Sequence, residues 1–395
     1  MRDKIVEKLI RKEAARQKQT IDLIPSENFV SDDVMEALGS VFTNKYAEGY
    51  PHARYYGGNE VVDEVEELAK SRALRLFRLA TNNWHVNVQP YSGSPANLAA
   101  ILALVPPGET IMGLQLSMGG HLTHGHKVSA TGRLWRSVQY DVDPKTERLN
   151  YDAILRLAKK EKPKLIIAGY TAYPRYIDWK AFRKIADAVG AYFMVDMSHI
   201  AGLIAGKVYP SPFPYADIVT TTTHKTLRGP RSAMIFANKE STLAKKNGVD
   251  IARAVDRAVF PGLQGGPHVN QVAAIAVAMK EADSPAYRKY AQQIVKNAKS
   301  LAYELERLGF RIISGGTDSH LLLVDVMAKG ISGKEASTRL EKAGIICNMN
   351  TIPHDPRPPM DPSGIRLGTP AVTTRGMKEK DMQKIAKKIV KVLLQ

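Results

Sequence analysis

Cysteine is almost absent from this chain, since Cys347 is the only one among 395 residues. A single cysteine excludes an internal disulfide bond and any metal cluster built on several cysteines. Long apolar runs are also missing, because no stretch approaches the roughly 20 residues that a membrane-spanning helix needs. The chain begins Met-Arg-Asp-Lys, a charged start rather than the apolar core of a secretion signal. These absences favour a cytoplasmic protein.

Acidic residues are scarce relative to basic ones: 39 Asp and Glu stand against 56 Lys and Arg, and the formal net charge is +17. Such a charge suits nucleic-acid binding, attraction of an anionic substrate, or simply a solvated basic surface. Part of it lies near the two ends, in helices expected over residues 3–19 and 375–391. No nucleic-acid-reading motif accompanies it, so we favour the solvated surface and expect neither a nucleic-acid partner nor a membrane partner.

What the chain does contain is an ordinary globular composition, 44% hydrophobic and 24% charged, with enough length for two or three domains. Apolar strand-like segments alternate with helix-like segments over residues 110–237, for example around the helix expected over 179–189. This alternation predicts an α/β fold with a mostly parallel sheet between helices. A helix over 285–308, followed by strands over 310–314 and 320–325, predicts a smaller C-terminal α/β domain.

One stretch, residues 217–231, organises the prediction of function. It begins with β-branched residues typical of a buried strand and ends in Gly229-Pro230, which stops regular structure. Lys225 is its only lysine and follows His224 where the strand gives way to a loop. A lysine in so basic a chain is ordinarily a solvated surface residue. Ligand chemistry gathers at strand ends in α/β folds, however, so Lys225 is also a candidate for Schiff-base formation.

A second apolar strand, over residues 191–195, ends in Asp196, and His199 follows three residues later. An acid and a lysine at neighbouring strand ends are what pyridoxal phosphate requires. The carboxylate keeps the pyridine nitrogen protonated so that the ring acts as an electron sink, and the lysine forms an imine with the aldehyde. The pairing of Asp196 with Lys225 therefore favours a pyridoxal-phosphate enzyme over a solvated lysine.

A Ser-Gly-Ser turn, residues 92–94, opens an apolar helix further upstream. Backbone N–H groups, hydroxyls and the positive end of the helix dipole converge at such a turn, which suits an anion. The turn lacks the Gly-Lys-Ser/Thr ending of a nucleotide-binding P-loop. Alone it fits an ordinary helix cap equally well. Beside Lys225 and Asp196 it becomes a candidate cradle for the cofactor phosphate.

The segments 195–202 and 220–231 resemble those of the serine hydroxymethyltransferase family, and the resemblance runs from about residue 23 to residue 373. It implies the aminotransferase-like fold of pyridoxal-phosphate enzymes (fold type I). It also implies three parts: an N-terminal arm over 1–35, a large cofactor-binding domain over 36–275 and a small C-terminal α/β domain over 276–395. The implied reaction converts L-serine and tetrahydrofolate reversibly into glycine, 5,10-methylenetetrahydrofolate and water.

The resemblance assigns roles to individual residues. The catalytic set is Lys225, Glu48, His199, Asp196 and Tyr56. Cofactor contacts fall on Ser92, Gly93, Ser94, His121, Thr171, Asp196, His199, His224, Lys225, Tyr46, Gly265 and Gly266. The serine or glycine substrate is expected to meet Ser26, Glu48, Tyr56, Arg231 and Arg366. Folate contacts are expected at Leu116, Gly120, Leu122 and Asn350.

Two loops of the resembling family reach the active site of a partner subunit. In this chain they carry Tyr46, Glu48 and Tyr56 in one loop, and Gly265 and Gly266 in the other. The resemblance therefore implies an obligate homodimer with shared active sites, and it leaves a tetramer open.

Three histidines, His121, His124 and His126, fall close together and invite a metal-binding interpretation. No carboxylate or cysteine nearby completes a familiar ligand set, so we expect no metal. The resemblance instead places His121 flat on the cofactor ring. Among the departures from the family is Met349, where many relatives carry lysine.

Other functions stay open on the same scaffold. A β-hydroxy-amino-acid aldolase of the threonine type would work without folate, although Asn350 and residues 119–122 argue against it. A relative acting on α-methylserine and an aminotransferase are further alternatives, and a modified tetrahydropterin could replace tetrahydrofolate. A basic RNA-binding protein on a retired enzyme scaffold belongs to a different class. Loss of the enzyme activity is disfavoured because four expected site residues are intact: Lys225, Asp196, Glu48 and Arg366.

Overall fold

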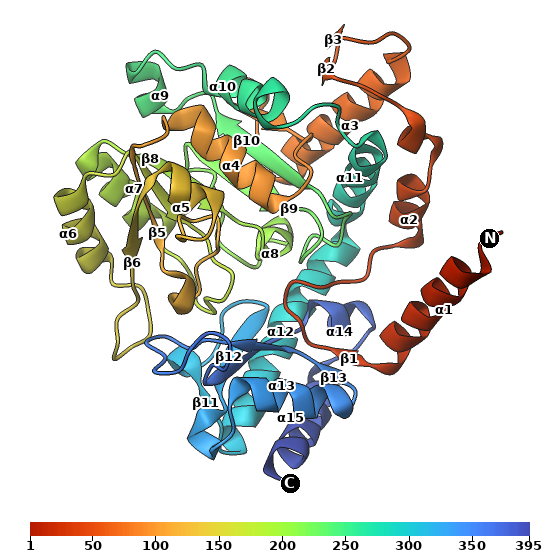
Figure 1. Ribbon diagram of the computed structural model, residues 1–395, viewed down its shortest axis with the longest axis vertical. Helices are drawn as coiled ribbons and strands as arrows, with labels where there is room; N and C mark the ends of the chain where they lie inside the picture. Colours follow the sequence, from red (N-terminus) through yellow and green to blue (C-terminus); the bar gives the residue numbers. More distant parts are fainter.

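A seven-stranded sheet forms the centre of the computed structural model, which describes residues 1–395 (Figure 1). In order across the sheet the strands are β4 (Trp84–Asn87), β10 (Ala233–Asn238), β9 (Ile218–Thr222), β8 (Tyr192–Asp196), β7 (Leu165–Ala168), β5 (Thr110–Leu114) and β6 (Arg136–Tyr140). Neighbouring strands from β9 to β6 run parallel, and β10 is antiparallel to both of its neighbours. The predicted mostly parallel sheet is confirmed.

Each face of this sheet is buried in a core of its own, because successive side chains of a strand point to opposite faces. In β8, Phe193 and Val195 enter one core, whereas Tyr192 and Met194 enter the other. The first core is covered by α3 (Glu60–Leu76), α6 (Tyr151–Glu161), α7 (Trp179–Val189), α8 (Ala201–Ala205) and α11 (Val269–Ala282). The second is covered by α4 (Gly93–Leu104), α9 (Thr242–Lys246) and α10 (Ile251–Arg257).

Shorter elements connect these layers. They are α2 (Asp32–Leu38), α5 (Ala130–Leu134), the 3₁₀ turns η1 (Val41–Asn44) and η2 (Leu116–Met118), the π-helical segment η3 (Ala258–Leu263) and a hairpin of β2 (Gly49–Tyr50) and β3 (Ala53–Arg54). No helix in the structure is both long and apolar enough to cross a membrane.

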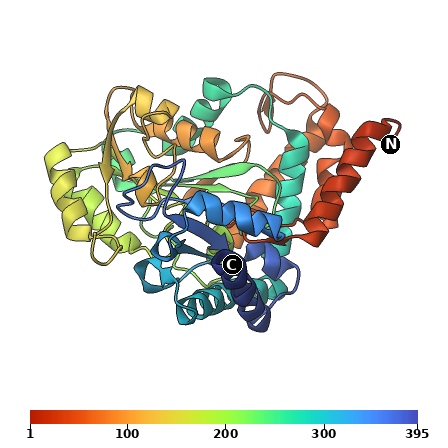
Figure 2. The same ribbon diagram turned by 60° about the horizontal axis from the view of Figure 1, so that its bottom comes forward.

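A second, antiparallel sheet lies in the C-terminal part, with the strand order β11 (Arg311–Ile312), β12 (Leu321–Asp325), β15 (Gly364–Gly368) and β14 (Asn348–Asn350). It has a separate hydrophobic core, packed by α12 (Pro285–Arg307), α13 (Gly333–Lys342) and α15 (Glu379–Leu394). Figure 2 shows this smaller unit in front of the large sheet. We propose domain boundaries at 1–35, 36–275 and 276–395, with α11 continuing to Ala282 across the second boundary.

Two predicted elements of the C-terminal part differ from the structure. The strand expected over 310–314 ends at Ile312, and the 3₁₀ turn η4 (Ile313–Gly315) follows, with Ser314 at a φ of 57°. The helix expected over 375–391 begins only at Glu379, after α14 (Pro370–Thr374), because Gly376 has a φ of 82° that interrupts helical geometry. A further 3₁₀ turn is η5 (Met327–Lys329).

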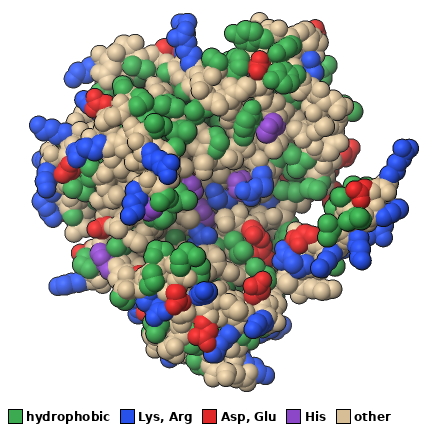
Figure 3. Space-filling model, in the orientation of Figure 1, with side chains coloured by type: hydrophobic (Ala, Val, Ile, Leu, Met, Phe, Trp, Pro, Cys, Tyr) green, Lys and Arg blue, Asp and Glu red, His purple; other side chains and the backbone are tan.

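The N-terminal helix α1 (Lys4–Gln19) stands away from the rest of the chain in the view of Figure 1. It has no buried residue, and Lys and Arg side chains lie along it (Figure 3). The chain then returns to the small sheet region, where β1 (Ile21–Asp22) pairs in parallel with β13 (Ile345–Ile346). Directly after β1 comes the segment that carries Ser26.

Candidate active site

A cavity of about 330 Å³ lies where the carboxyl ends of β8 and β9 face the C-terminal sheet. This is the place at which ligands bind in open α/β sheets. Its lining is almost entirely polar. Twelve residues predicted from the sequence line it: Ser26, Ser92, Gly93, Ser94, His121, Thr171, Asp196, His199, His224, Lys225, Arg231 and Arg366.

Lys225 lies three residues beyond the end of β9, and its Nζ donates a hydrogen bond to the Thr222 hydroxyl at 3.1 Å. Burial lowers the pKa of the Lys225 ammonium to about 8. The Asp196 carboxylate opposes this shift, whereas Arg366 and Arg231 add to it. A lysine with a lowered pKa has a substantial neutral fraction near physiological pH, which is the form that attacks a carbonyl carbon.

Asp196 ends β8, and the protein surrounds its carboxylate with donors. Oδ2 accepts hydrogen bonds from Asn97 Nδ2 at 2.8 Å and from His124 Nε2 at 3.1 Å, and Oδ1 accepts the Ser198 backbone N–H at 3.0 Å. Burial alone raises the pKa of this carboxyl, but the hydrogen bond and charge of His124 hold it well below its usual range. Asp196 is therefore an ionised group able to keep a ring nitrogen protonated.

Two of these donors are side chains that sequence reasoning missed as partners of Asp196. Asn97 lies one turn inside α4, and its own Oδ1 accepts a hydrogen bond from Thr220 Oγ1 at 2.6 Å. His124 was considered only as a metal ligand, yet it is almost fully buried against Asp196. The available signal was the spacing of His121 and His124. The first histidine lines the cavity, and the second, three residues later, contacts Asp196.

The Ser-Gly-Ser turn forms the first residues of α4. Ser92 is the N-cap of this helix, but its hydroxyl makes no capping hydrogen bond, so it is free for a ligand. A Cβ added at Gly93 would lie 2.7 Å from Thr222 Cγ2, which explains why glycine occupies this position. Free hydroxyls, helix N–H groups and a close glycine together form an anion cradle.

The histidines of the cavity are uncharged. Burial, together with neighbouring positive groups, lowers the pKa of His121 to about 4 and that of His224 to about 3. His121 Nδ1 lies 2.7 Å from the Thr123 hydroxyl, and His224 Nδ1 is buried without a hydrogen-bond partner. His199 is buried as well, and its pKa lies well below the usual value because of burial and the charge of Lys225.

Arg366 comes from β15, the C-terminal side of the cavity. Its Nη1 donates to the Thr171 carbonyl at 2.7 Å and its Nε donates to Asn348 Oδ1 at 3.1 Å. Burial lowers the pKa of the guanidinium to about 10, so it is still a cation at neutral pH. With Nε and Nη1 held by the protein, Nη2 is left available for a ligand carboxylate. Asn348, which orients Arg366, was not predicted.

Five predicted residues lie in a separate cluster away from the cavity: Tyr46, Glu48, Tyr56, Gly265 and Gly266. The Tyr46 hydroxyl donates to Glu48 Oε1 at 3.3 Å, and the rings of Tyr46 and Tyr56 meet edge to face with centroids 5.1 Å apart. Both tyrosines are about half exposed, at 56% and 48%. Within one chain these residues do not complete the cavity.

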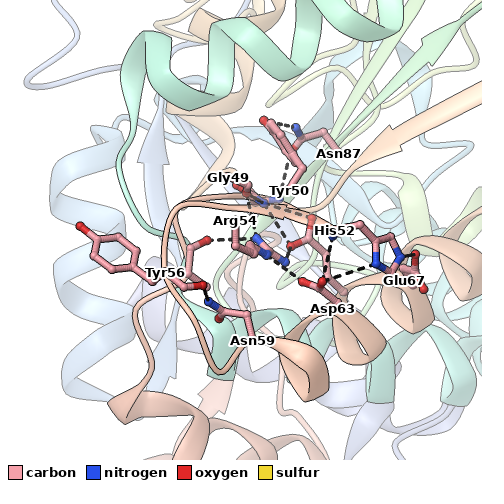
Figure 4. Close-up of polar contacts among 12 residues, drawn as sticks. Gly49, Tyr50, His52, Arg54, Tyr56, Asn59, Asp63, Glu67 and Asn87 are labelled. Carbon is pink, nitrogen blue, oxygen red and sulfur yellow. Dashed lines mark hydrogen bonds and ion pairs between the residues drawn. The ribbon is translucent and has the colours of Figure 1, made fainter.

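A buried ion-pair network fixes the loop that carries this cluster (Figure 4). Arg54 donates to Asp63 Oδ1 at 2.8 Å and to Glu66 Oε2 at 2.7 Å, and its Nη1 donates to the carbonyls of Ala47 and Gly49. These two carbonyls flank Glu48. The network therefore holds the backbone on both sides of Glu48, whose half-buried side chain contacts Tyr46.

We expect Arg54→Met to destabilise the protein by about 3–5 kcal/mol, because it leaves the buried carboxylates of Asp63 and Glu66 without their cation. Thermal unfolding measures this loss. The matched control is Arg75→Met, since Arg75 pairs with Asp283 at an exposed position and should contribute less than about 1 kcal/mol. Equal effects of the two substitutions would contradict this account of the loop.

The four predicted folate residues, Leu116, Gly120, Leu122 and Asn350, do not line the cavity. They lie on segments that approach each other beside it. The Thr351 hydroxyl, next to Asn350, donates to the Ser117 carbonyl in η2 at 3.2 Å. The structure thus brings the two segments together.

The fold and the cavity define a class of protein. A lysine of lowered pKa, an ionised carboxylate held by three donors and an anion cradle converge at the strand ends of a mostly parallel sheet. This is the arrangement of a pyridoxal-phosphate-dependent enzyme. A model of one family, described as serine hydroxymethyltransferase, matches residues 1–389. The chain belongs to the serine hydroxymethyltransferase family.

Proteins with this name are close relatives over nearly the whole chain. The serine hydroxymethyltransferase of Acidobacterium capsulatum is 57% identical over 96% of this chain and 86% of its own length. That of Acidothermus cellulolyticus is 55% identical over 97% of this chain and 87% of its own. That of Coprothermobacter proteolyticus is 53% identical over 98% and 90%, respectively.

Proposed function

We propose that the chain catalyses the reversible reaction of L-serine with tetrahydrofolate to give glycine, 5,10-methylenetetrahydrofolate and water. Its membership of the serine hydroxymethyltransferase family supports this reaction. The single structural observation that carries the proposal is the convergence of Lys225, Asp196 and Arg366 on one cavity. Serine-to-glycine conversion by the purified, cofactor-loaded protein tests it.

The donor set of the cavity fits pyridoxal phosphate. The hydroxyls of Ser92 and Ser94 and the N-terminus of α4 suit its phosphate, Asp196 suits its ring nitrogen and Lys225 suits its aldehyde. The unpartnered Nδ1 of buried His224 marks a polar group that the protein alone does not satisfy. When bound, the cofactor supplies an electron sink for the pair left at the substrate Cα after a bond breaks.

The remaining roles belong to side chains of the protein. Arg366, anchored through Nε and Nη1, binds the substrate carboxylate through its outer nitrogen. Arg231 adds a second guanidinium to the cavity lining, and Ser26 and Thr171, which also line it, would border the bound amino acid and cofactor. His121 would pack on the cofactor ring, and His199 would contact its ring oxygen. Folate would lie between the segments of Leu116, Gly120, Leu122 and Asn350.

A homodimer with shared sites explains the separate cluster of Tyr46, Glu48 and Tyr56. These side chains are held on a rigid loop and face outward, away from their own cavity. A second copy related by twofold symmetry would place them, with Gly265 and Gly266, at the cavity of its partner. Glu48 then moves the proton of the substrate hydroxyl. We also place the enzyme in the cytoplasm.

Mixing two inactive variants tests the shared site. Lys225→Ala removes the lysine of the cavity, and Glu48→Gln removes the carboxylate of the separate cluster. Each homodimer should therefore be inactive. Refolding them together at equal amounts should recover about one quarter of the wild-type activity, because half of the dimers are hybrids and each hybrid has one intact site. Verified hybrids without activity, or a fully active monomer in ultracentrifugation, would contradict the shared site.

The lowered pKa of Lys225 predicts the pH dependence of cofactor capture. Only the neutral amine reacts, so the rate at which the cofactor-free protein captures pyridoxal phosphate should rise with pH through about pH 8 and then level off. At neutral pH a shift from 10.5 to about 8 raises the neutral fraction by about 300-fold. Stopped-flow absorbance measures the rate.

The Asp196→Asn variant provides the directional control for this titration. The Asp196 carboxylate stabilises the ammonium of Lys225, so its loss should move the midpoint to lower pH. A midpoint near 10 in the wild-type protein, or an upward shift in the variant, would show that burial and charge do not tune this lysine as described.

A further inference from the structure

His199 makes a second contact that the proposed reaction does not use. Its Nδ1 lies 3.1 Å from Nε2 of His320, and the two rings have centroids 5.3 Å apart. His199 belongs to the loop after β8 of the large sheet, whereas His320 stands directly before β12 of the C-terminal sheet. Both are buried, with 5% and 0% of their surface exposed. The pair therefore joins the two halves of the molecule immediately behind the cavity.

Only one proton can lie between these two nitrogens. Burial, with the charges of Lys225 and Arg366, lowers the pKa of both rings, to about 3 for His320, so both are neutral at physiological pH. A neutral imidazole has one N–H donor and one lone-pair acceptor. Either His320 donates to His199 Nδ1, or His199 Nδ1 donates to His320. The nitrogen that His199 presents to the cavity, Nε2, is a donor in the first arrangement and an acceptor in the second.

The far side of His320 decides between the two arrangements. Its Nδ1 is buried and has no hydrogen-bond partner. In the second arrangement this nitrogen would carry a proton and become a buried N–H without an acceptor, which is rare in native structures. In the first arrangement it carries only a lone pair. The position of His320 is itself fixed, because its carbonyl accepts the backbone N–H of Thr369 at 3.0 Å.

We propose that His320 is a positioning residue that donates its Nε2 proton to His199 Nδ1 and thereby fixes His199 as the Nε2–H tautomer. His199 then presents a hydrogen-bond donor, not an acceptor, to the cavity. This polarity matches an oxygen of a bound ligand. Resting on the proposed function, that oxygen is the ring oxygen of pyridoxal phosphate. His320, which does not line the cavity, thus sets the ligand preference of His199, which does. Outer hydrogen-bond partners act in the same way on metal-binding histidines.

Neutron diffraction from deuterium-exchanged crystals of the cofactor-free protein tests the tautomer directly. We expect deuterium on Nε2 of His199 and on Nε2 of His320, and none on Nδ1 of His199. Deuterium on His199 Nδ1 would overturn the proposal. Because this measurement needs neither cofactor nor turnover, it can fail while the proposed reaction holds, and it can succeed if that reaction is wrong.

Two variants of His320 test the consequence for ligand binding. His320→Leu removes the donor and should weaken the binding of pyridoxal phosphate roughly tenfold and shift the visible absorption maximum of the bound cofactor. His320→Gln keeps an N–H donor and should bind within about threefold of wild type with an unshifted maximum. Ser319→Ala is the control, since Ser319 is the buried neighbour whose hydroxyl has no partner.

The comparison separates positioning from packing. Thermal unfolding of each variant shows whether it folds. If Leu and Gln weaken cofactor binding equally while both remain folded, His320 acts only through its volume and the proposal is wrong. If Ser319→Ala produces the same spectral shift, the effect belongs to the loop and not to the donor.

Discussion

Replacing Lys225 by alanine should reduce serine-to-glycine conversion by roughly four orders of magnitude or more. Lys225 is the lysine that the structure places in the cavity, at the end of β9 and beside the anion cradle. Its loss removes the only amine positioned to bond the cofactor aldehyde, and removal of a covalent partner typically costs this much in rate. Steady-state turnover measures the loss, and the visible band of lysine-bound pyridoxal phosphate should vanish with it.

Lys246→Ala is the control for this prediction, because Lys246 lies exposed in the last turn of α9. It should keep full turnover and the visible band. A Lys225→Ala protein that folds and retains more than about one per cent of the wild-type rate would show that another group performs this role.

Asp196→Asn should lower turnover by roughly three orders of magnitude, the second largest effect expected here. The substitution keeps the size of the side chain but removes its negative charge. The donors Asn97, His124 and the Ser198 N–H would then meet a neutral amide, and nothing in the cavity would keep the ring nitrogen of the cofactor protonated. Turnover at saturating serine and tetrahydrofolate, together with cofactor affinity, measures the effect.

A matched Asp-to-Asn change is available at Asp178, the N-cap of α7. Asparagine caps a helix as well as aspartate does, so Asp178→Asn should leave both stability and turnover unchanged. If Asp196→Asn loses less than about tenfold in turnover while the control behaves as expected, the carboxylate does not have the function assigned to it.

Local sequence was sufficient to place Lys225 and Asp196. Each follows a short run of β-branched or apolar residues, and the alternation of such runs with helices predicts parallel strands whose carboxyl ends share one edge. The anion cradle could also be predicted from local sequence, because its serines and glycine are consecutive and open an apolar helix. These predictions depend on residues within one turn or one strand end.

Contacts between distant segments could not be predicted in this way. Asn97 reaches Asp196 across 99 positions of the chain, His199 reaches His320 across 121, and Arg366 reaches Thr171 across 195. Nothing in the local pattern marks these partners, because the tertiary fold alone brings them together. The early end of β11 was missed for a related reason: Ser314 adopts a positive φ, and its carbonyl accepts a hydrogen bond from Arg175 of the other unit at 2.6 Å.

The roles of Tyr46, Glu48 and Tyr56 come from the family resemblance, since one chain does not bring them to its own cavity. What the structure adds is the rigid support of their loop by Arg54. On the folate side, Met349 lies in β14 beside Asn350, at a position where the family resemblance leads us to expect lysine. This departure makes the identity of the one-carbon acceptor the point that most needs a direct test.

The most direct test is serine-to-glycine conversion by the cofactor-loaded protein, measured with and without tetrahydrofolate. The account predicts rapid conversion that depends on tetrahydrofolate, because the one-carbon unit is transferred to it. Conversion at the same rate without tetrahydrofolate would contradict hydroxymethyl transfer and identify a folate-independent aldolase on this scaffold.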